Sequence, residues 1–128
     1  MLTVHHLNNS RSQRVLWLLE ELGVEYEIKF YQRDAKTLLA PPSLREVHPL
    51  GKSPVLTDGE ITVAESGAII EYLLDTYGDG ALRPEKGTQA YRDYVYWLHY
   101  AEGSAMSPLL LSVIFHALPR QGPVLARP

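Results

Sequence analysis

Residues 49–56 read Pro49-Leu50-Gly51-Lys52-Ser53-Pro54-Val55-Leu56, and residues 65–70 read Glu65-Ser66-Gly67-Ala68-Ile69-Ile70. In the first stretch a turn leads into a short apolar strand, and a proline stands at the junction. A proline cannot donate a backbone hydrogen bond there, and a cis bond before it would make a sharp corner. Such a corner leaves the backbone N–H and C=O of Ser53 free to pair with an extended peptide ligand, as one more strand would.

The second stretch predicts the start of a helix. Glu65 and Ser66 lie at its N-terminus, where free backbone amides and the helix dipole favour an anion. A carboxylate, a hydroxyl and free amides at one helix start suit a ligand end that carries both a carboxylate and an ammonium. The simpler interpretation is that Glu65 complements the dipole and Ser66 caps the helix, with no ligand involved.

The segments on either side predict an alternation of strands and helices. Apolar residues between Val15 and Leu22 recur at helical spacing, and Gly23 suits a left-handed helix end. Asp58-Gly59 between two alternating segments is a strong hairpin signal. The expected order is β-α-β-α-β-β-α, a thioredoxin-like α/β fold. Its strands are predicted at 2–7, 26–31, 55–57 and 61–64, and its helices at 11–21 and 66–77, with a loop and room for one short helix in 33–47.

The remaining sequence predicts a linker and a second domain. We expect a first domain over residues 1–78, a linker rich in glycine and charge over 79–87, and the beginning of an all-helical domain over 88–128. A helical stripe starts after Thr88, and Gly103 and Pro108 are expected to bend or interrupt it.

The composition excludes several classes of function. The chain has 128 residues, a formal net charge of −3 and no cysteine. This charge argues against a nucleic-acid partner or an acidic membrane held by bulk charge, and the missing cysteine excludes disulfide or thiolate chemistry by the protein itself. We expect no membrane span, no metal and a cytoplasmic location, since no signal peptide is recognisable at Met1. His5 and His6 point to opposite faces of a strand, so they cannot chelate one metal together.

Several motifs in the same order resemble the cytosolic glutathione transferase family, particularly its bacterial and fungal serine-type branch. They are Ser10-Arg11, Leu16-Trp17-Leu18-Leu19, His48-Pro49-Leu50-Gly51, Ser53-Pro54 and Glu65-Ser66-Gly67. The resemblance extends over roughly residues 1 to 110. It implies a detoxifying transferase that binds glutathione as co-substrate and stabilises its thiolate for attack on hydrophobic electrophiles. The alternative is a non-catalytic glutathione-binding or protein-interaction module of the same fold.

The resemblance also implies roles for individual residues. Ser10, between the first strand and the first helix, is the expected catalytic hydroxyl that donates to the glutathione sulfur. Its alternative role is an ordinary helix cap, for which Ser12 competes, and Asn9 or Ser12 are the other possible sulfur donors. The expected glutathione-binding residues are Ser10, Lys52, Ser53, Pro54, Glu65 and Ser66. For Lys52 the alternative is a solvated turn lysine.

Two further expectations concern partners. Tyr96 and Tyr100 are candidates for the wall of the co-substrate pocket, although core packing explains most aromatic residues near them. The resemblance implies a homodimer, and we expect an exposed apolar stripe on Ile69–Tyr77 to contribute to its interface.

Overall fold

The computed structural model describes residues 1–117. The chain forms two compact units, of which the first covers residues 1–84 and the second begins at Glu85. The predicted domain limits at residues 78 and 88 stay predictions, and residues 118–128 of the predicted helical domain lie outside the described residues.

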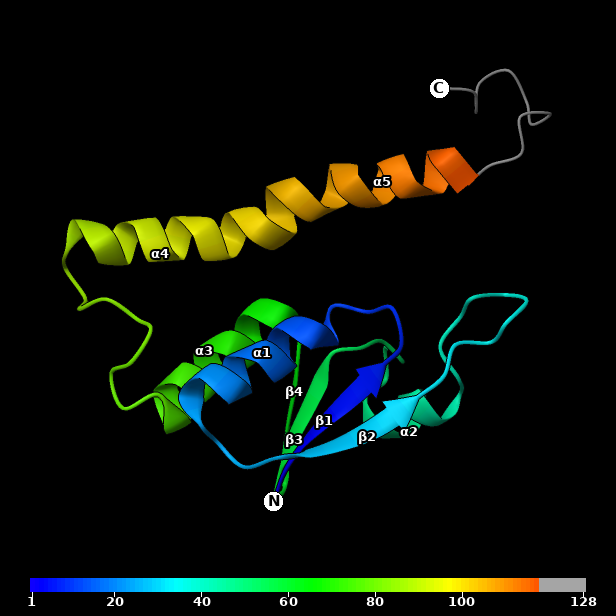
Figure 1. Cartoon of the computed structure of the whole chain (residues 1–128), viewed down its shortest axis with the longest axis horizontal. Coiled ribbons are helices and arrows are strands. Elements are labelled where there is room, and N and C mark those ends of the chain that lie inside the picture. The colour runs from blue at the N-terminus through cyan, green and yellow to red at the C-terminus, as the bar shows by residue number, and fades with distance from the viewer. Residues whose placement is uncertain (118–128) are drawn as a thin grey trace. The chain divides into compact units, whose positions relative to one another are not determined.

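The first unit has the predicted order of strands and helices, and the α/β thioredoxin-like fold is confirmed (Figure 1). Gly23 ends the first helix with φ 63°, a left-handed conformation that glycine adopts without steric cost. The short helix left open in residues 33–47 begins directly after Pro42. The elements are β1 (Leu2–Leu7), α1 (Ser12–Leu22), β2 (Glu27–Tyr31), α2 (Ser43–Val47), β3 (Val55–Asp58), β4 (Ile61–Ala64) and α3 (Ser66–Tyr77).

The four strands form one mixed sheet in the order β2-β1-β3-β4. Strand β2 runs parallel to β1, with His6 opposite Phe30, whereas β3 runs antiparallel to β1, with His5 opposite Val55. Strands β3 and β4 form the hairpin predicted at Asp58-Gly59. The end of β1, the start of β3 and the end of β4 therefore lie at the same edge of the sheet.

Helices cover both faces of the sheet (Figure 1). Helices α1 and α3 pack on the face that carries Leu2 and Val4, while α2 packs by Leu44 on the opposite face. The apolar residues of α3 belong to the first of these cores. The expectation of an exposed apolar stripe on α3 is wrong, because Ile69, Leu73 and Leu74 are buried against the sheet and α1.

The second unit is helical from Gln89 to Ala117. Helix α4 (Gln89–Tyr100) begins at Thr88, whose hydroxyl accepts a hydrogen bond from the Tyr91 amide at 3.1 Å. A π-helical turn, Ala101–Ala105, interrupts the α-helical hydrogen bonding at Gly103, as predicted. Helix α5 (Met106–Ala117) follows directly, with Pro108 near its start.

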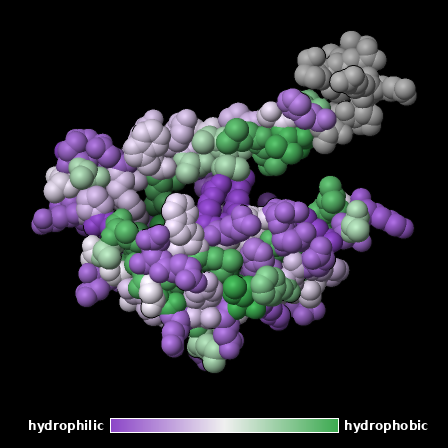
Figure 2. All heavy atoms as spheres, viewed as in Figure 1, coloured by the Kyte–Doolittle hydropathy of each residue, from purple (hydrophilic) through white to green (hydrophobic). Residues whose placement is uncertain are grey.

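Apolar side chains gather along α5 (Figure 2). Between 42% and 66% of the surface of these side chains is exposed, and they lie on all sides of the helix. Within residues 1–117, no helix combines the length and the apolar character that a bilayer span requires. The exposed apolar residues of α5 are Leu109, Leu110, Leu111, Val113, Ile114 and Phe115.

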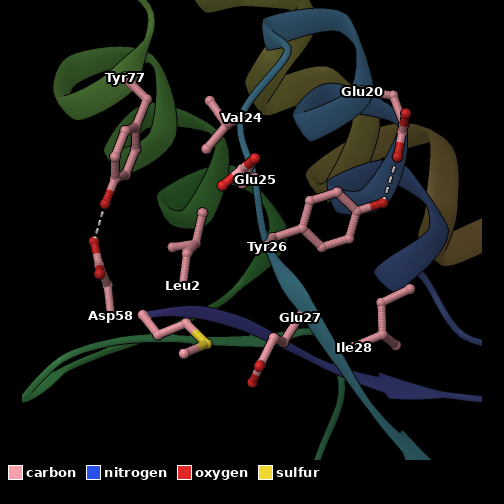
Figure 3. Close-up of a pocket in the computed structure, with 10 residues that line it drawn as sticks. Leu2, Glu20, Val24, Glu25, Tyr26, Glu27, Ile28, Asp58 and Tyr77 are labelled. Atoms are coloured by element: carbon pink, nitrogen blue, oxygen red, sulfur yellow. Dashed lines mark hydrogen bonds between the residues drawn. The ribbon is translucent and has the colours of Figure 1, made fainter.

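A carboxylate at the hairpin turn ties the sheet to the end of α3. Asp58 accepts hydrogen bonds from the hydroxyls of Tyr72, at 2.9 Å, and Tyr77 (Figure 3). The bond from Tyr77, followed by that from Tyr72, lowers the pKa of Asp58 below its ordinary value of 3.8. The same bond raises the pKa of Tyr77 to about 12. Both shifts favour the state in which the carboxylate is charged and the phenols are protonated.

We predict that Asp58→Asn lowers the free energy of unfolding at pH 7 by about 1 kcal/mol, since it weakens hydrogen bonds to a charged group at a partly exposed site. The folded state has the lower pKa, so the contribution is present above pH 3.8 and is lost as the pH falls through the folded value. Urea unfolding from pH 7 down to pH 3 measures the difference. Glu60→Gln, at an exposed position in the same turn, is the control, and a difference that does not shrink in acid would contradict the account.

Candidate functional site

The residues of the proline corner and of the α3 start come together at one edge of the sheet. The peptide bond between Ser53 and Pro54 is cis, as predicted. Val55 pairs with Ala64 on β4, so Pro54 and Glu65 follow next to each other beyond the end of the ladder. The β1 register places Ser53 beside the end of β1 in the same way.

The backbone pairing between β1 and β3 ends at Val55, and beyond it the Ser53 hydroxyl makes the hydrogen bonds to β1. It donates to the His5 carbonyl at 2.8 Å and accepts from the Leu7 amide at 3.3 Å. The Ser53 backbone N–H and C=O make no hydrogen bond to any residue within 1–117. The corner is thus fixed to β1 by its side chain, and its backbone polar groups stay available to a ligand.

Ser10 lies between this corner and the first turn of α1. Its Oγ is 3.3 Å from Ser53 Oγ and 2.7 Å from Ser12 Oγ, and it accepts from the Ser12 amide at 3.3 Å. The N-cap residue of α1 is Arg11, and no side-chain hydrogen bond caps the helix there, so the choice between a capping and a ligand role for Ser10 stays a prediction. Ser12 is the fully buried first residue of α1, and its hydroxyl bonds Ser10 and His6 Nδ1, the latter at 2.8 Å.

The number of protons limits the directions of these bonds. Each serine hydroxyl carries one proton. Ser53 gives its proton to the His5 carbonyl, so only Ser10 can donate across the contact between Ser10 and Ser53. The direction at Ser12 depends on His6. When His6 Nδ1 is unprotonated, Ser12 donates to it and accepts from Ser10; when Nδ1 carries a proton, Ser12 donates to Ser10, and the Ser10 proton is free for a ligand.

The loop that carries Ser10 is held by Arg33, a residue that the sequence analysis missed. The Arg33 amide donates to Asn8 Oδ1 at 2.7 Å, and its guanidinium donates to the carbonyls of Asn8 at 3.0 Å and Asn9 at 3.4 Å. Asn9 itself has φ 52° and an exposed side chain. No sequence signal links Arg33 to this loop, because the contact depends on β2 lying parallel to β1.

The start of α3 is strained and lacks a side-chain cap. Glu65, the N-cap residue, has φ 75° and ψ 129°, a region that non-glycine residues rarely adopt. Within residues 1–117 no side chain bonds the first amides of α3, in contrast to α4, where Thr88 caps. Ser66, the first helical residue, is buried. The positive end of the helix is therefore open to an anion.

The other predicted site residues are exposed. Lys52 precedes the corner and forms no ion pair with residues 1–117. Tyr96 and Tyr100 belong to α4 in the second unit, where 58% and 40% of their surfaces are exposed and their rings stack with centroids 5.9 Å apart. Trp97 packs edge-on against both rings. Within the described residues these three aromatic side chains contact one another and stay exposed, and both their pocket role and their core role stay predictions.

A hollow of about 910 Å³ opens at the other end of the sheet (Figure 3). It is lined by the start of β1, the ends of α1 and α3, the hairpin turn, and the loop that leads from α1 into β2. It contains the carboxylates of Glu20, Glu25, Glu27 and Asp58. The length of β1 separates it from Ser10. Because its charge repels an anionic ligand, we assign the candidate site to the edge with Ser10.

The two adjacent histidines have different surroundings. His5 is buried on the α2 face, with Nδ1 2.9 Å from the Tyr31 hydroxyl and Nε2 3.1 Å from Thr57 Oγ1. Burial, followed by the charge of Lys29, lowers the pKa of His5. His6 is half-buried on the α1 face. The described part of the chain has no group of three metal-binding side chains, and His5 is fully explained as a core residue.

The match to a known protein family falls within the first unit of the chain. Residues 1–75 match the family described as glutathione S-transferase, N-terminal domain. The chain belongs to the glutathione S-transferase family. Its relatives include glutathione S-transferase 3 of Schizosaccharomyces pombe, which is 45% identical over 83% of this chain and 43% of the relative.

Solved structures of this family have the same fold. A glutathione S-transferase from Actinobacillus pleuropneumoniae is 45% identical, with a TM-score of 0.82 over 93% of this chain and 56% of its own. The glutathione transferase URE2P6 of Phanerochaete chrysosporium, solved in complex with oxidized glutathione, is 29% identical, with a TM-score of 0.75 over 98% of this chain and 59% of its own. The chain spans about half the length of the curated relatives that it matches.

We predict that Glu65→Gly raises the free energy of unfolding by about 1 kcal/mol. The strain at φ 75° costs roughly 1–3 kcal/mol, whereas glycine adds only about 0.5–1 kcal/mol of chain entropy to the unfolded state. Glu65→Ala removes the same charge but keeps the Cβ atom, so it is the matched control. Urea denaturation compares the variants, and equal stability of the Gly and Ala variants would show that the backbone is not strained.

Proposed function

We propose that this chain is the glutathione-binding part of a glutathione transferase and that Ser10 donates a hydrogen bond to the glutathione thiolate. One observation carries the proposal: the Ser10 hydroxyl, the unpaired backbone of Ser53 and the uncapped start of α3 lie at the same edge of the sheet. Glutathione is an extended tripeptide whose thiol would meet Ser10, whose cysteinyl backbone would pair with Ser53, and whose charged γ-glutamyl end would lie at the start of α3.

The γ-glutamyl end is expected at the start of α3. Its carboxylate would accept from the first amides of α3 and from Ser66, and its ammonium would pair with Glu65. The cysteinyl backbone would pair with the N–H and C=O of Ser53 as an added strand, with Pro54 fixing the corner. At the other end, Lys52 is exposed and near enough in sequence to meet the glycyl carboxylate.

Transfer requires the glutathione sulfur as a thiolate, because the thiolate is the nucleophile. Lowering the thiol pKa by about 2 units takes roughly 2.7 kcal/mol of differential stabilisation, which one well-placed hydroxyl and the positive start of a helix can supply. The sulfur itself then attacks the electrophile, and the protein provides orientation and a fixed donor. No covalent bond to the enzyme is formed.

The proposal extends to the partners of the reaction. Tyr96 and Tyr100 would form part of an apolar wall for a small hydrophobic electrophile, since their rings are exposed and stacked. We propose a cytoplasmic homodimer, with an interface that does not use the buried stripe of α3. No metal is required by this chemistry.

We predict that Ser10→Ala raises the pKa of the bound glutathione thiol by about 1–2 units, so that the thiolate at neutral pH falls ~10- to 100-fold. Ultraviolet absorbance of the thiolate during a glutathione titration at several pH values measures this effect. Calorimetry at a pH below the thiol pKa should give nearly the same affinity for both proteins, since the remaining contacts are kept.

Asn9→Gly is the control for Ser10→Ala, because glycine tolerates the positive φ of Asn9. A thiolate that depends on Asn9 and not on Ser10 would move the donor to Asn9. Binding with an unshifted thiol in the unaltered chain would favour the non-catalytic module, and no binding at all would refute the proposal.

A further inference from the structure

The Ser12 hydroxyl links Ser10 to a titratable ring inside the protein. Ser12 is fully buried, and its Oγ lies 2.7 Å from Ser10 Oγ and 2.8 Å from His6 Nδ1. Both distances are those of good hydrogen bonds between a hydroxyl and an oxygen or a nitrogen. An unbroken chain of hydrogen bonds therefore leads from Ser10, at the candidate sulfur position, to His6.

We propose that His6 receives the thiol proton of bound glutathione through Ser10 and Ser12. The inference rests on the proposed function, because it assumes that the sulfur lies against Ser10. The thiol gives its proton to Ser10 Oγ, Ser10 gives its own proton to Ser12 Oγ, and Ser12 gives its own to His6 Nδ1. The S–H bond breaks and an N–H bond forms on His6, each hydroxyl ends with one proton, and the charges become thiolate and imidazolium.

The hydrogen bonds leave one direction for this transfer. The other branch from Ser10 leads to Ser53, which donates to the His5 carbonyl, and a backbone carbonyl does not take up a proton under these conditions. The branch through Ser12 ends at an imidazole nitrogen, a group that can take up a proton.

The contacts of the His6 ring within the described residues are few and uncharged. Among residues 1–117, its hydrogen-bond and ring contacts come from Ser12 on α1 and Phe30 on β2, whose ring lies edge-on at 5.4 Å, and both groups are uncharged. Nε2 makes no hydrogen bond to a residue of that range, so the bond to Ser12 sets the state of Nδ1.

The proton transfer to His6 also fixes the direction in which the Ser10 hydroxyl donates. Once Nδ1 carries the proton, Ser12 must donate to Ser10, and the Ser10 proton then points to the thiolate. A chain of hydrogen bonds aligned in one direction strengthens each of its members. His6 does not touch the substrate, so it is a positioning residue that orients Ser10 and holds the proton.

The unaltered chain tests this proposal by ¹⁵N NMR of the histidine rings. We compare glutathione with S-methylglutathione, which has the same backbone but no thiol proton, at a pH where His6 is neutral in the free protein. The His6 signals are assigned by their loss in His6→Asn. The expected result is that glutathione shifts the His6 nitrogens to imidazolium values and S-methylglutathione does not. Identical His6 signals with both ligands would overturn the proposal.

Variants give a second readout that does not depend on the NMR assignment. Asparagine at position 6 can still accept from Ser12 but cannot hold a proton, so His6→Asn separates a structural role from proton uptake. We expect His6→Asn and Ser12→Ala each to lower the thiolate absorbance near neutral pH about tenfold, which corresponds to one pKa unit. The double variant should lose no more than either single variant, since both break one relay.

The outcomes separate this inference from the proposed function. If Ser10→Ala reduces the thiolate and His6→Asn leaves it unchanged, the relay is wrong and the transferase proposal stands. If neither substitution changes the thiolate, the role of Ser10 in the proposed function fails together with the relay, and if no glutathione binds, the proposed function as a whole fails. His6→Phe, which keeps a ring beside Phe30, covers the case in which His6→Asn does not fold, and a normal thiolate in it would likewise contradict the relay.

Discussion

The hydroxyl of Ser53 holds the candidate site together, because it replaces the sheet pairing that the proline corner ends. By donating to the His5 carbonyl and accepting from the Leu7 amide, it fixes the corner to the end of β1. The Ser53 backbone then has no partner in residues 1–117 and stays free for an extended ligand. Ser10 is placed by the same arrangement, since its hydroxyl contacts that of Ser53.

The site combines this fixed corner with the start of α3, where the backbone is strained and the first amides have no side-chain partner. Glu65 keeps a left-handed backbone, and the helix behind it begins without a capping side chain. Such features cost stability in the free protein and gain contacts when a ligand binds. The tie between Asp58 and the tyrosines of α3 lies at the opposite end of the same helix and helps to hold it against the sheet.

Local signals in the sequence were sufficient to predict most of the first unit. The hairpin at Asp58-Gly59, the helix end at Gly23 and the cis bond before Pro54 each follow from what one or two residues permit. The roles of His6 and Arg33 do not, because they arise from contacts between elements far apart in sequence. Periodicity places a side chain on a face but does not say which group it meets there.

The same limit applies to Ser12 and to α3. A serine before a helix suggests a cap, whereas the buried Ser12 hydroxyl bonds Ser10 Oγ and His6 Nδ1, partners that only the folded chain provides. The spacing of the apolar residues on α3 is equally consistent with a subunit interface and with a core. In the structure these residues pack against the sheet and α1, so they belong to the core.

The most direct test of the account is a crystal structure of this chain with reduced glutathione. We expect the sulfur within hydrogen-bond distance of Ser10 Oγ, the cysteinyl backbone paired with Ser53, and the γ-glutamyl carboxylate at the first amides of α3. A sulfur that lies out of reach of Ser10, or a ligand that leaves the Ser53 backbone unpaired, would contradict it.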